Sequence, residues 1–403
     1  MLYQLFNMPI IELIEYKSTT INRSEIPGFV VKKLKQEYSN QVKLEADFSE
    51  NSPECDRWKI KAQGWVGYIP LTPDFQIIIQ PKVPLSNLFG MLEYAYNLKS
   101  FRFLDGLVNC ESLQEFYNFL VNILTKKILD QARKGFYRAY LSKTENLTYI
   151  RGRIDMQKVV QKPWDVNFKC DYQEHTRDIS DNQILAWTLF VIGRSGFCSE
   201  KVAPIVAKAF HILQGLVSLQ PFKSTDCLGK KYHRLNEDYQ PLHALCRFFL
   251  DNIGANHQRG ERSMLPFLVD MARLYEKFVA EWLKFNLPSN LRVKEQEKVD
   301  IINPQIYCRI DLVIYEVKTD KVVYIIDTKY KLTNKPSTND INQVVAYATY
   351  KNCKEAVLVY PKKLTNPINQ LAAKSKIRLR SLTFSLDANL EKAGQDFLDE
   401  LIN

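Results

Sequence analysis

The sequence predicts a multidomain α+β protein with a β-rich N-terminal unit, a helical middle region and a C-terminal α/β domain with a mixed sheet. Short runs of Val, Ile and aromatic residues alternate with turn residues before position 80, and apolar residues recur at helical spacing from 113 to 253. After position 270 the patterns follow the order helix, strand, strand, helix, strand. Because the length of 403 residues fits two or three domains, we expect domains at 1–100, 101–258 and 259–403.

The N-terminal unit is expected to contain short strands separated by polar loops. A helix follows them, and Ser86 is the residue expected to cap it, with the helix continuing through Tyr96. The expected strands are Val42–Phe48, Trp58–Ala62, Trp65–Ile69 and Phe75–Gln80.

The middle region is predicted to be a helical layer. A polar run at 256–262 interrupts its apolar pattern, which is why the last domain boundary is placed there. Arg151 and Arg153 lie in a less regular segment, where they could contact nucleic acid or a partner subunit, or simply be solvated. The expected helices are Leu113–Arg133, Ile179–Ile192, Val202–Leu219 and Tyr239–Ile253.

Composition limits the classes of function. The net charge of +10 and the pI near 9.0 favour a polyanionic partner, since clustered Lys and Arg displace counterions from phosphates. Eight cysteines without a Cys-x-x-Cys pair, no secretion signal and no apolar run of membrane-spanning length indicate a cytoplasmic protein. Four residues could form a zinc site, but we prefer to interpret them as buried thiols and surface histidines, because their spacing matches no common zinc finger. These candidates are Cys227, His233, His243 and Cys246.

Two β-rich segments carry the acidic residues of greatest interest. The segments 307–315 and 322–330 are separated by the polar run 316–321, which predicts a hairpin. Because side chains alternate along a strand, Asp311 points away from the apolar row of its segment, and Asp327 shares one face with Lys329. Two carboxylates and an ammonium are therefore expected to converge.

This convergence suits Mg²⁺, which is held by one or two carboxylates and keeps positions open for water and phosphate. A lysine beside the metal can orient the attacking water and offset the charge that develops on phosphorus. The pattern thus favours a phosphodiester hydrolase. The alternative is the solvated face of an ordinary sheet, since Asp-x-Lys is also common by chance.

The flanking helices add two candidate residues. Glu276 lies in the helix expected at 270–285, beside its apolar face, where it could join a metal site or extend its carboxylate into water. Gln343 shares one helical face with Tyr347, in a helix expected to begin at Asp340. Strands at Ala356–Tyr360 and Arg378–Leu386 and a closing helix from Asp387 complete the domain.

An Asp on one strand followed by Asp-x-Lys on the next resembles the pattern of the PD-(D/E)XK nucleases. The sequence departs from it in lacking a proline before Asp311. Together with the Glu276 and Gln343 helices, the segment 327–331 resembles McrC, the nuclease subunit of the McrBC restriction system. Further similarity to this family lies at 67–69, 77–83, 91–95, 151–154 and 181–185.

The resemblance implies a restriction-endonuclease-like C-terminal domain that cleaves modified DNA with Mg²⁺. It implies that Asp311, Asp327 and Thr328 hold the metal, that Lys329 positions water, and that Glu276 and Gln343 complete the site. It also implies docking of the N-terminal and middle regions on a McrB-like AAA+ GTPase ring. GTP would bind that partner, since this chain has no G-x-x-x-x-G-K-[ST] loop.

Basic residues near the site are candidates for contacts with double-stranded DNA. Two other functions remain open: a free-standing structure-specific or repair nuclease, and a catalytically inactive subunit that binds and stimulates the partner. The candidates for DNA contacts are Lys331, Lys362, Lys363, Lys374 and Lys376.

Overall fold

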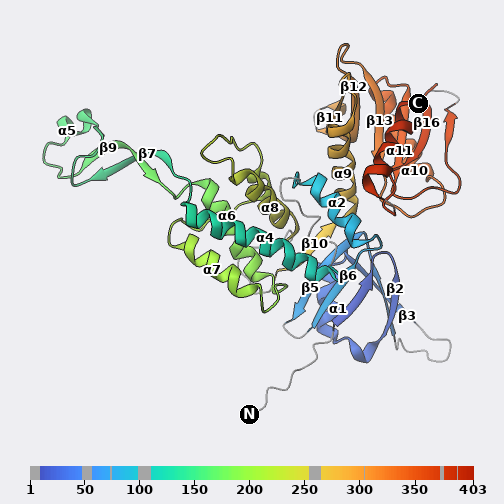
Figure 1. Cartoon of the computed structure of the whole chain (residues 1–403), viewed down its shortest axis with the longest axis horizontal. Helices are drawn as coiled ribbons and strands as arrows, with labels where there is room; N and C mark the ends of the chain where they lie inside the picture. The colour runs from blue at the N-terminus through green and yellow to red at the C-terminus, as the bar shows by residue number, and fades with distance from the viewer. Residues whose placement is uncertain are drawn as a thin grey trace. The chain divides into compact units, whose positions relative to one another are not determined.

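The protein is represented by a computed structural model that describes residues 10–47, 57–72, 75–98, 110–253, 265–303, 305–372, 376–387 and 389–403. The chain divides into two compact units, one formed by Met1–Phe116 with Gln258–Asn403 and the other by Tyr117–His257. Figure 1 shows their elements. The polar run at 256–262, where the last boundary was expected, lies outside the described residues.

The N-terminal part of the first unit contains two sheets around one core. A four-stranded sheet has the order β1-β6-β5-β10, and a three-stranded sheet has the order β2-β4-β3. Helix α1 contributes Val30 and Leu34 to a core shared with Leu13 and Ile60 of the two sheets. The elements are β1 (Ile10–Ile14), β2 (Ser18–Asn22), α1 (Gly28–Glu37), β3 (Val42–Asp47), β4 (Arg57–Ala62), β5 (Trp65–Thr72), β6 (Phe75–Gln80) and β10 (Phe267–Asp270).

Strand β10 comes from the C-terminal segment but completes the N-terminal sheet, where it pairs antiparallel with β5. Gly67 makes this close pairing possible. Its φ of +153° is rarely adopted by other residues, and a Cβ at this position would lie 2.0 Å from the carbonyl oxygen of Phe267. The sheet therefore joins two segments that are almost 200 residues apart in the sequence.

Helix α2 (Leu85–Ala95) begins two residues earlier than expected, and Ser86 does not cap it. The N-cap is Pro84, whose carbonyl oxygen accepts hydrogen bonds from the backbone N–H groups of Asn87 and Leu88 at 3.0 and 3.1 Å. The expectation was wrong because the first turn closes on a backbone carbonyl and uses no side-chain cap.

The second unit has a helical layer that carries a β-sheet arm. In Figure 1 this arm extends from the helices of its own unit. The prediction of a helical middle region holds for α4, α6, α7 and α8 but misses the arm, whose strands have the order β7-β9-β8. The helices are α4 (Leu113–Lys134), which starts in the first unit, α6 (Ser180–Arg194), α7 (Ala203–Gln214) and α8 (Tyr239–Asn252). The arm comprises β7 (Ala139–Leu147), β8 (Arg153–Ile154), α5 (Met156–Gln161) and β9 (Phe168–Thr176).

The root of the arm is fixed to the helical layer by a buried amide. Asn182 of α6 donates hydrogen bonds to the backbone oxygens of Tyr137 and Arg177, at 2.9 and 2.7 Å, just outside β7 and β9. The hydroxyl of Tyr239 donates to Asn182 Oδ1 at 2.7 Å. Asn182 thus has a structural role that the sequence did not reveal.

The histidine and cysteine residues weighed as a zinc site serve mainly as core. Cys227 and Cys246 are buried, as expected, and His233 is exposed. His243 is not a surface histidine, however. It is buried, with Nδ1 2.9 Å from the Tyr232 hydroxyl and Nε2 3.0 Å from a backbone oxygen of α6. Partners on both ring nitrogens satisfy its polarity inside the core.

The C-terminal segment forms the predicted mixed sheet, with the order β11-β12-β13-β14-β16-β15. The pairs β13–β14 and β14–β16 are parallel, and the other pairs are antiparallel. Strand β11 and the short β15 were not expected. The elements are α9 (Met271–Asn286), β11 (Leu291–Asn303), β12 (Ile306–Glu316), β13 (Val322–Thr328), α10 (Thr338–Tyr350), β14 (Glu355–Tyr360), β15 (Asn369–Leu371), β16 (Arg378–Thr383) and α11 (Leu390–Ile402).

The last two helices begin at side-chain caps. Ser337 Oγ accepts a hydrogen bond from the backbone of Asp340, so α10 starts two residues before the expected Asp340. Asn389 Oδ1 accepts from the second and third residues of α11, and the helix therefore starts at Leu390 and not at Asp387. None of the helices in the described part of the chain is long and apolar enough to cross a membrane.

Candidate functional site

Two carboxylates meet on adjacent strands of the C-terminal sheet. The register of β12 and β13 pairs Leu312 with Ile326, and its continuation puts Asp311 opposite Asp327. Asp311 Oδ2 accepts hydrogen bonds from the backbone N–H and the hydroxyl of Thr328, at 3.0 and 3.2 Å. The predicted convergence of the two aspartates is therefore present, with Thr328 holding one of them in place.

Lys329 completes this group just beyond the end of β13. Its Nζ lies 2.6 Å from Asp327 Oδ2 and donates a hydrogen bond to Gln343 Oε1 at 3.0 Å. Gln343 in turn donates to the hydroxyl of Tyr347 at 2.7 Å. The α10 helix therefore supplies a chain of hydrogen bonds that aims the lysine at the carboxylates.

Glu276 approaches the same carboxylates from α9. Burial, followed by the negative charge of Asp311, raises the pKa of Glu276 to about 7. Gln296 of β11 donates a hydrogen bond to Glu276 Oε1. Of the two interpretations of this glutamate, a site contact and a solvated surface residue, the structure favours the first.

The charges of the site are strongly coupled. Burial raises the pKa of Asp311, and burial together with the charge of Asp311 raises that of Asp327. Burial acts to lower the pKa of Lys329, but the neighbouring carboxylates, Asp327 first, leave it above its usual value. The lysine is therefore a stable cation, while the carboxylates gather more negative charge than a buried site holds easily.

Asp340 is a site residue that sequence reasoning missed. It is buried, with Oδ1 3.7 Å from Lys329 Nζ and 2.9 Å from Lys331 Nζ. Ser337 donates a hydrogen bond to its Oδ2 at 2.7 Å. The signal was the Ser-x-x-Asp spacing at the start of α10, which indicates a helix cap and places an acid at a fixed point beside β13. Gln296 gave no comparable signal.

Asp327 has the clearest capacity to bind a cation. Its Oδ1 is buried and has no hydrogen-bond partner among the described residues, although a buried carboxylate oxygen normally has one. No group of three His, Cys, Asp or Glu residues in the described ranges is close enough to form a ready metal cage. Mg²⁺ does not require one, because it binds through one or two carboxylates and keeps several waters.

The lysines proposed for DNA contacts differ in where they lie relative to the candidate site. Lys331 is half-exposed and held by Asp340, so its charge lies at the edge of the site. Lys362 and Lys363 are exposed after β14, and Lys362 Nζ is 4.0 Å from Asp387. Lys374 lies outside the described residues.

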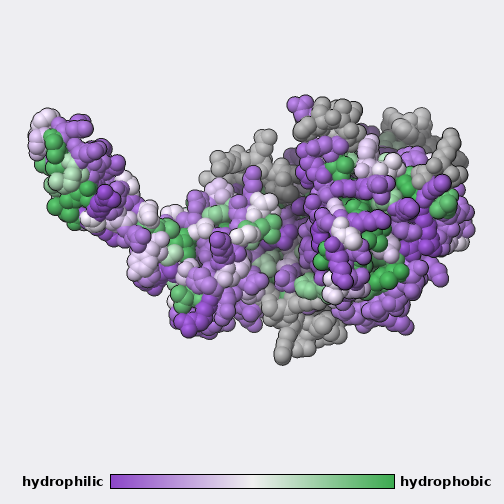
Figure 2. Space-filling view, turned by 90° about the horizontal axis from the view of Figure 1, so that it is seen from above, coloured by the Kyte–Doolittle hydropathy of each residue, from purple (hydrophilic) through white to green (hydrophobic). Residues whose placement is uncertain are grey.

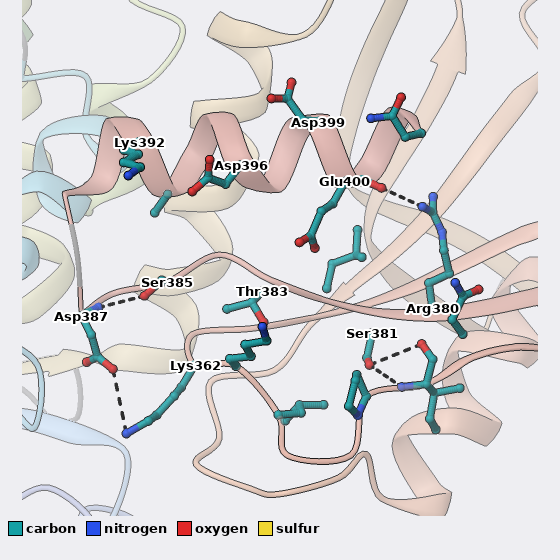
Figure 3. A pocket seen from close by; sticks show the side chains of 18 of the residues that line it. Lys362, Arg380, Ser381, Thr383, Ser385, Asp387, Lys392, Asp396, Asp399 and Glu400 are labelled. Carbon is teal, nitrogen blue, oxygen red and sulfur yellow. Dashed lines mark hydrogen bonds and ion pairs between the residues drawn. The ribbon is translucent and has the colours of Figure 1, made fainter.

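Lys362 and Lys363 line a pocket of about 950 Å³ between β16 and α11, to which neither Asp311 nor Asp327 contributes. Figure 3 shows that basic and acidic side chains share it. Arg380 is occupied there, because it donates two 2.8 Å hydrogen bonds to the last carbonyls of α11. The labelled acids of the pocket are Asp387, Asp396, Asp399 and Glu400.

These features define a multidomain α+β protein with a carboxylate and lysine site on the C-terminal sheet. Residues 60–361 match the family model described as McrBC 5-methylcytosine restriction system component. The chain belongs to this family, which confirms the resemblance to the McrBC system.

Two relatives illustrate the similarity. The chain is 23% identical over 268 residues to the type IV methyl-directed restriction enzyme EcoKMcrBC of Escherichia coli (strain K12), covering 62% of this chain and 74% of that protein. Its fold resembles a chain from the half-complex of the tetradecameric assembly of Thermococcus gammatolerans McrB AAA+ hexamers with bound McrC. That match has a TM-score of 0.57 and 19% identity, and covers 98% of this chain and 100% of the other.

Proposed function

We propose that this chain is the McrC-type, Mg²⁺-dependent DNA endonuclease subunit of a McrBC-type restriction system. It hydrolyses phosphodiester bonds in methylated DNA in the cytoplasm, with a nuclease domain of the PD-(D/E)XK type. It acts when docked on a McrB-like AAA+ GTPase ring, whose GTP hydrolysis it stimulates. The observation that carries the proposal is the meeting of Asp311 on β12 and Asp327 on β13 with Lys329, which lies just beyond the end of β13.

The donor set fits a hard divalent cation. Asp327 offers a buried oxygen without a hydrogen bond to any described residue, Asp311 lies opposite it, and the backbone of Thr328 lies between Asp327 and Lys329. Mg²⁺ bound there would supply Lewis-acid polarisation of a phosphate oxygen and a more acidic bound water. Glu276, with a pKa near 7, is a further acidic contributor that can hold or release a proton at neutral pH.

Lys329 performs the part of the chemistry that the protein provides directly. Its pKa is raised, so the group stays protonated at neutral pH and acts as a hydrogen-bond donor. Held by Gln343, the ammonium orients a water for attack and offsets the negative charge that grows on the scissile phosphate. A charge fixed in advance costs no reorganisation during the reaction, which is why its placement matters.

The test of the nuclease function is Asp327→Ala in the full chain, assayed on methylated plasmid with the partner GTPase, GTP and Mg²⁺. Cleavage should fall by about 10²-fold or more, because a metal-binding carboxylate is lost. Asp300→Ala is the matched control, since Asp300 is exposed on β11 of the same sheet and pairs with Lys298, away from the site. Equal cleavage by wild type and Asp327→Ala would refute the nuclease assignment. The alternative would then be that this chain is a subunit that does not itself cut DNA.

The arm of the second unit supports docking on a partner. Large apolar side chains are exposed at its end, where Figure 2 shows hydrophobic residues gathered, and Trp164 is 78% exposed. Arg151 is engaged within the arm, stacking on Tyr172 at 4.0 Å, whereas Arg153 is exposed. Other large apolar residues exposed in this part of the arm are Tyr149, Ile150, Met156, Val160 and Val166.

Docking through the arm is tested by Trp164→Ser, with Leu235→Ser as control. Leu235 is 69% exposed in the same unit but precedes α8, outside the arm. Binding to the AAA+ ring and stimulation of its GTP hydrolysis should weaken at least about tenfold for Trp164→Ser, as is typical of a buried aromatic anchor. If the Leu235 variant were the weaker binder, another surface would be the docking site.

A further inference from the structure

Two ionisable side chains lie at one end of the four-stranded N-terminal sheet, where two of its strands finish. Strands β1 and β6 are parallel, so Glu15 and Lys82, which follow them, emerge at the same end of the sheet. The backbone N–H of Glu15 bonds to the carbonyl oxygen of Gln80 at 3.0 Å and extends this pairing. Both side chains are removed from solvent, with relative exposures of 0% for Glu15 and 9% for Lys82.

These two side chains meet a tyrosine of the C-terminal segment. The Tyr330 hydroxyl donates a hydrogen bond to Glu15 Oε2 at 3.0 Å. Lys82 Nζ lies 3.9 Å from the ring centroid of Tyr330 and 4.3 Å from that of Tyr16. The Tyr330 ring also contacts Tyr275 of α9, with centroids 5.8 Å apart. Glu15, Lys82 and Tyr330 therefore form one buried cluster.

The cluster is a poor device for stability alone. Lys82 Nζ makes no hydrogen bond to any described residue, and its nearest carboxylate oxygen, on Glu15, is 3.8 Å away. Removing two charges from water costs as much as such a pair returns, and apolar side chains of similar volume would serve a core at least as well. The cluster does fix the orientation of the Tyr330 side chain, because the Tyr330 hydroxyl donates to one defined acceptor, Glu15 Oε2.

The fixed orientation of Tyr330 affects the candidate active site because Tyr330 is the chain neighbour of Lys329. Tyr330 directly follows Lys329, and the two residues lie beyond the end of β13. The backbone N–H of Lys329 bonds to the carbonyl oxygen of Val359 on β14 at 2.8 Å. Lys329 is thus held on one side by the C-terminal sheet and on the other by Tyr330, which bonds to Glu15 at the end of the N-terminal sheet.

We propose that Glu15, Lys82 and Tyr330 are positioning residues, through which the N-terminal sheet sets the place of the Lys329 ammonium. The inference rests on the proposed nuclease function for its kinetic consequence, but the geometric link stands apart from it. The segment 77–83, which the family resemblance singled out, thereby acquires a role: its lysine helps to hold the strand end that carries Lys329.

The first test is Tyr330→Phe in the full chain, which removes the hydroxyl and keeps the ring. Single-turnover cleavage at saturating methylated DNA should slow about 10-fold to 10²-fold, as expected for a misplaced catalytic group, while DNA affinity stays unchanged. Tyr315→Phe is the matched control. Its hydroxyl also donates to a buried glutamate, Glu297 Oε2 at 2.7 Å, on the same sheet but outside the cluster. Equal rates in the two variants would overturn the proposal.

A double-mutant cycle separates positioning from a general loss of structure. In a Lys329→Ala background Tyr330→Phe should cause no further loss of rate, because the tyrosine acts through the absent ammonium. Independent, multiplicative losses would show that Tyr330 acts in another way and would refute the inference. Glu15→Gln should follow the same pattern, since it removes the charge that the hydroxyl meets.

The second test does not depend on cleavage. Lys329 is 14% exposed at its side chain and Lys331 is 52% exposed, so the two differ in access to an acylating reagent. Competitive labelling with acetic anhydride and mass spectrometry should give Lys329 at least a threefold higher reactivity in Tyr330→Phe, with Lys331 unchanged. Unaltered labelling of Lys329 would overturn the positioning role. A higher labelling without any wild-type cleavage would instead count against the proposed function alone.

Discussion

Replacing Glu276 with Gln is expected to stabilise the protein in metal-free buffer, and to do so increasingly as the pH rises. Burial, helped by the charge of Asp311, raises the pKa of Glu276 from 4.5 to about 7. Between these values the folded protein keeps a proton that the unfolded chain has released. The free energy of unfolding of the wild type therefore falls as pH rises through this window. The amide in the Glu276→Gln variant cannot ionise and does not share this loss.

The size of the effect follows from the shift. The difference between 4.5 and about 7, at about 1.4 kcal/mol per pH unit, gives an upper bound of about 3.5 kcal/mol. Glu276 is only partly shielded from water, so we expect about 2 kcal/mol in favour of Glu276→Gln at pH 7. The difference should be small at pH 4.5, where both states of the wild type bind the proton.

The assay is urea unfolding in EDTA at pH 4.5 to 8, followed by hydrogen exchange of peptides from α9 and β13. This local measurement is needed because the chain has two compact units and a single global transition would mix them. Glu281→Gln is the control, since its carboxylate lies on the same helix but pairs with Lys284 at 2.7 Å. A difference between wild type and Glu276→Gln that stayed constant with pH would refute the reasoning.

Adding Mg²⁺ extends the same experiment to the proposed cofactor. A cation that binds the folded state alone stabilises it in proportion to the logarithm of its concentration. Mg²⁺ should therefore raise the unfolding free energy of the wild type at pH 7.5, and less so that of Asp311→Asn. Identical responses to Mg²⁺ in these two proteins would count against a metal site at Asp311.

The other predictions concern the lysines and the N-terminal sheet. Lys329→Ala should lower the single-turnover cleavage rate about 10²-fold with little change in DNA affinity, measured by rapid quench and by fluorescence anisotropy. Replacing Lys362 and Lys363 together should weaken DNA binding and flatten its salt dependence, by up to about 0.9 in log–log slope per lost phosphate contact, whereas Lys318→Ala at the far turn of the hairpin should not. Gly67→Ala should destabilise the N-terminal sheet by about 2 kcal/mol or more in urea unfolding, because its Cβ would collide with the β10 backbone.

The sequence identified the core of the candidate site because strand geometry allows few alternatives. Asp327 and Lys329 are two positions apart beside an apolar strand, so they had to share a face once that strand formed. Asp311 needed only the register of one hairpin to join them. Gln343 and Tyr347 are four positions apart on one helix and were correctly placed on one face, where they now bond to each other.

Other parts of the fold left no pattern to find. The arm strand β7 exposes residues on both faces, so it lacks the alternation by which a half-buried strand is recognised. Strand β2, with the sequence Ser-Thr-Thr-Ile-Asn, is also mostly polar, so its sequence did not indicate a strand. Asp340 was read only as a helix start, because its contacts with Lys329 and Lys331 depend on where α10 lies against the sheet.

The sequence by itself determined the local chemistry: which strands carry the carboxylates, which side of each strand they occupy, and which lysine accompanies them. The tertiary structure alone decided that β10 completes the N-terminal sheet and that Tyr330 reaches Glu15 across 315 positions of sequence. Periodicity acts over a few residues and fixes the direction of a side chain. The acceptor that a buried hydroxyl meets depends on long-range packing, which no local pattern encodes.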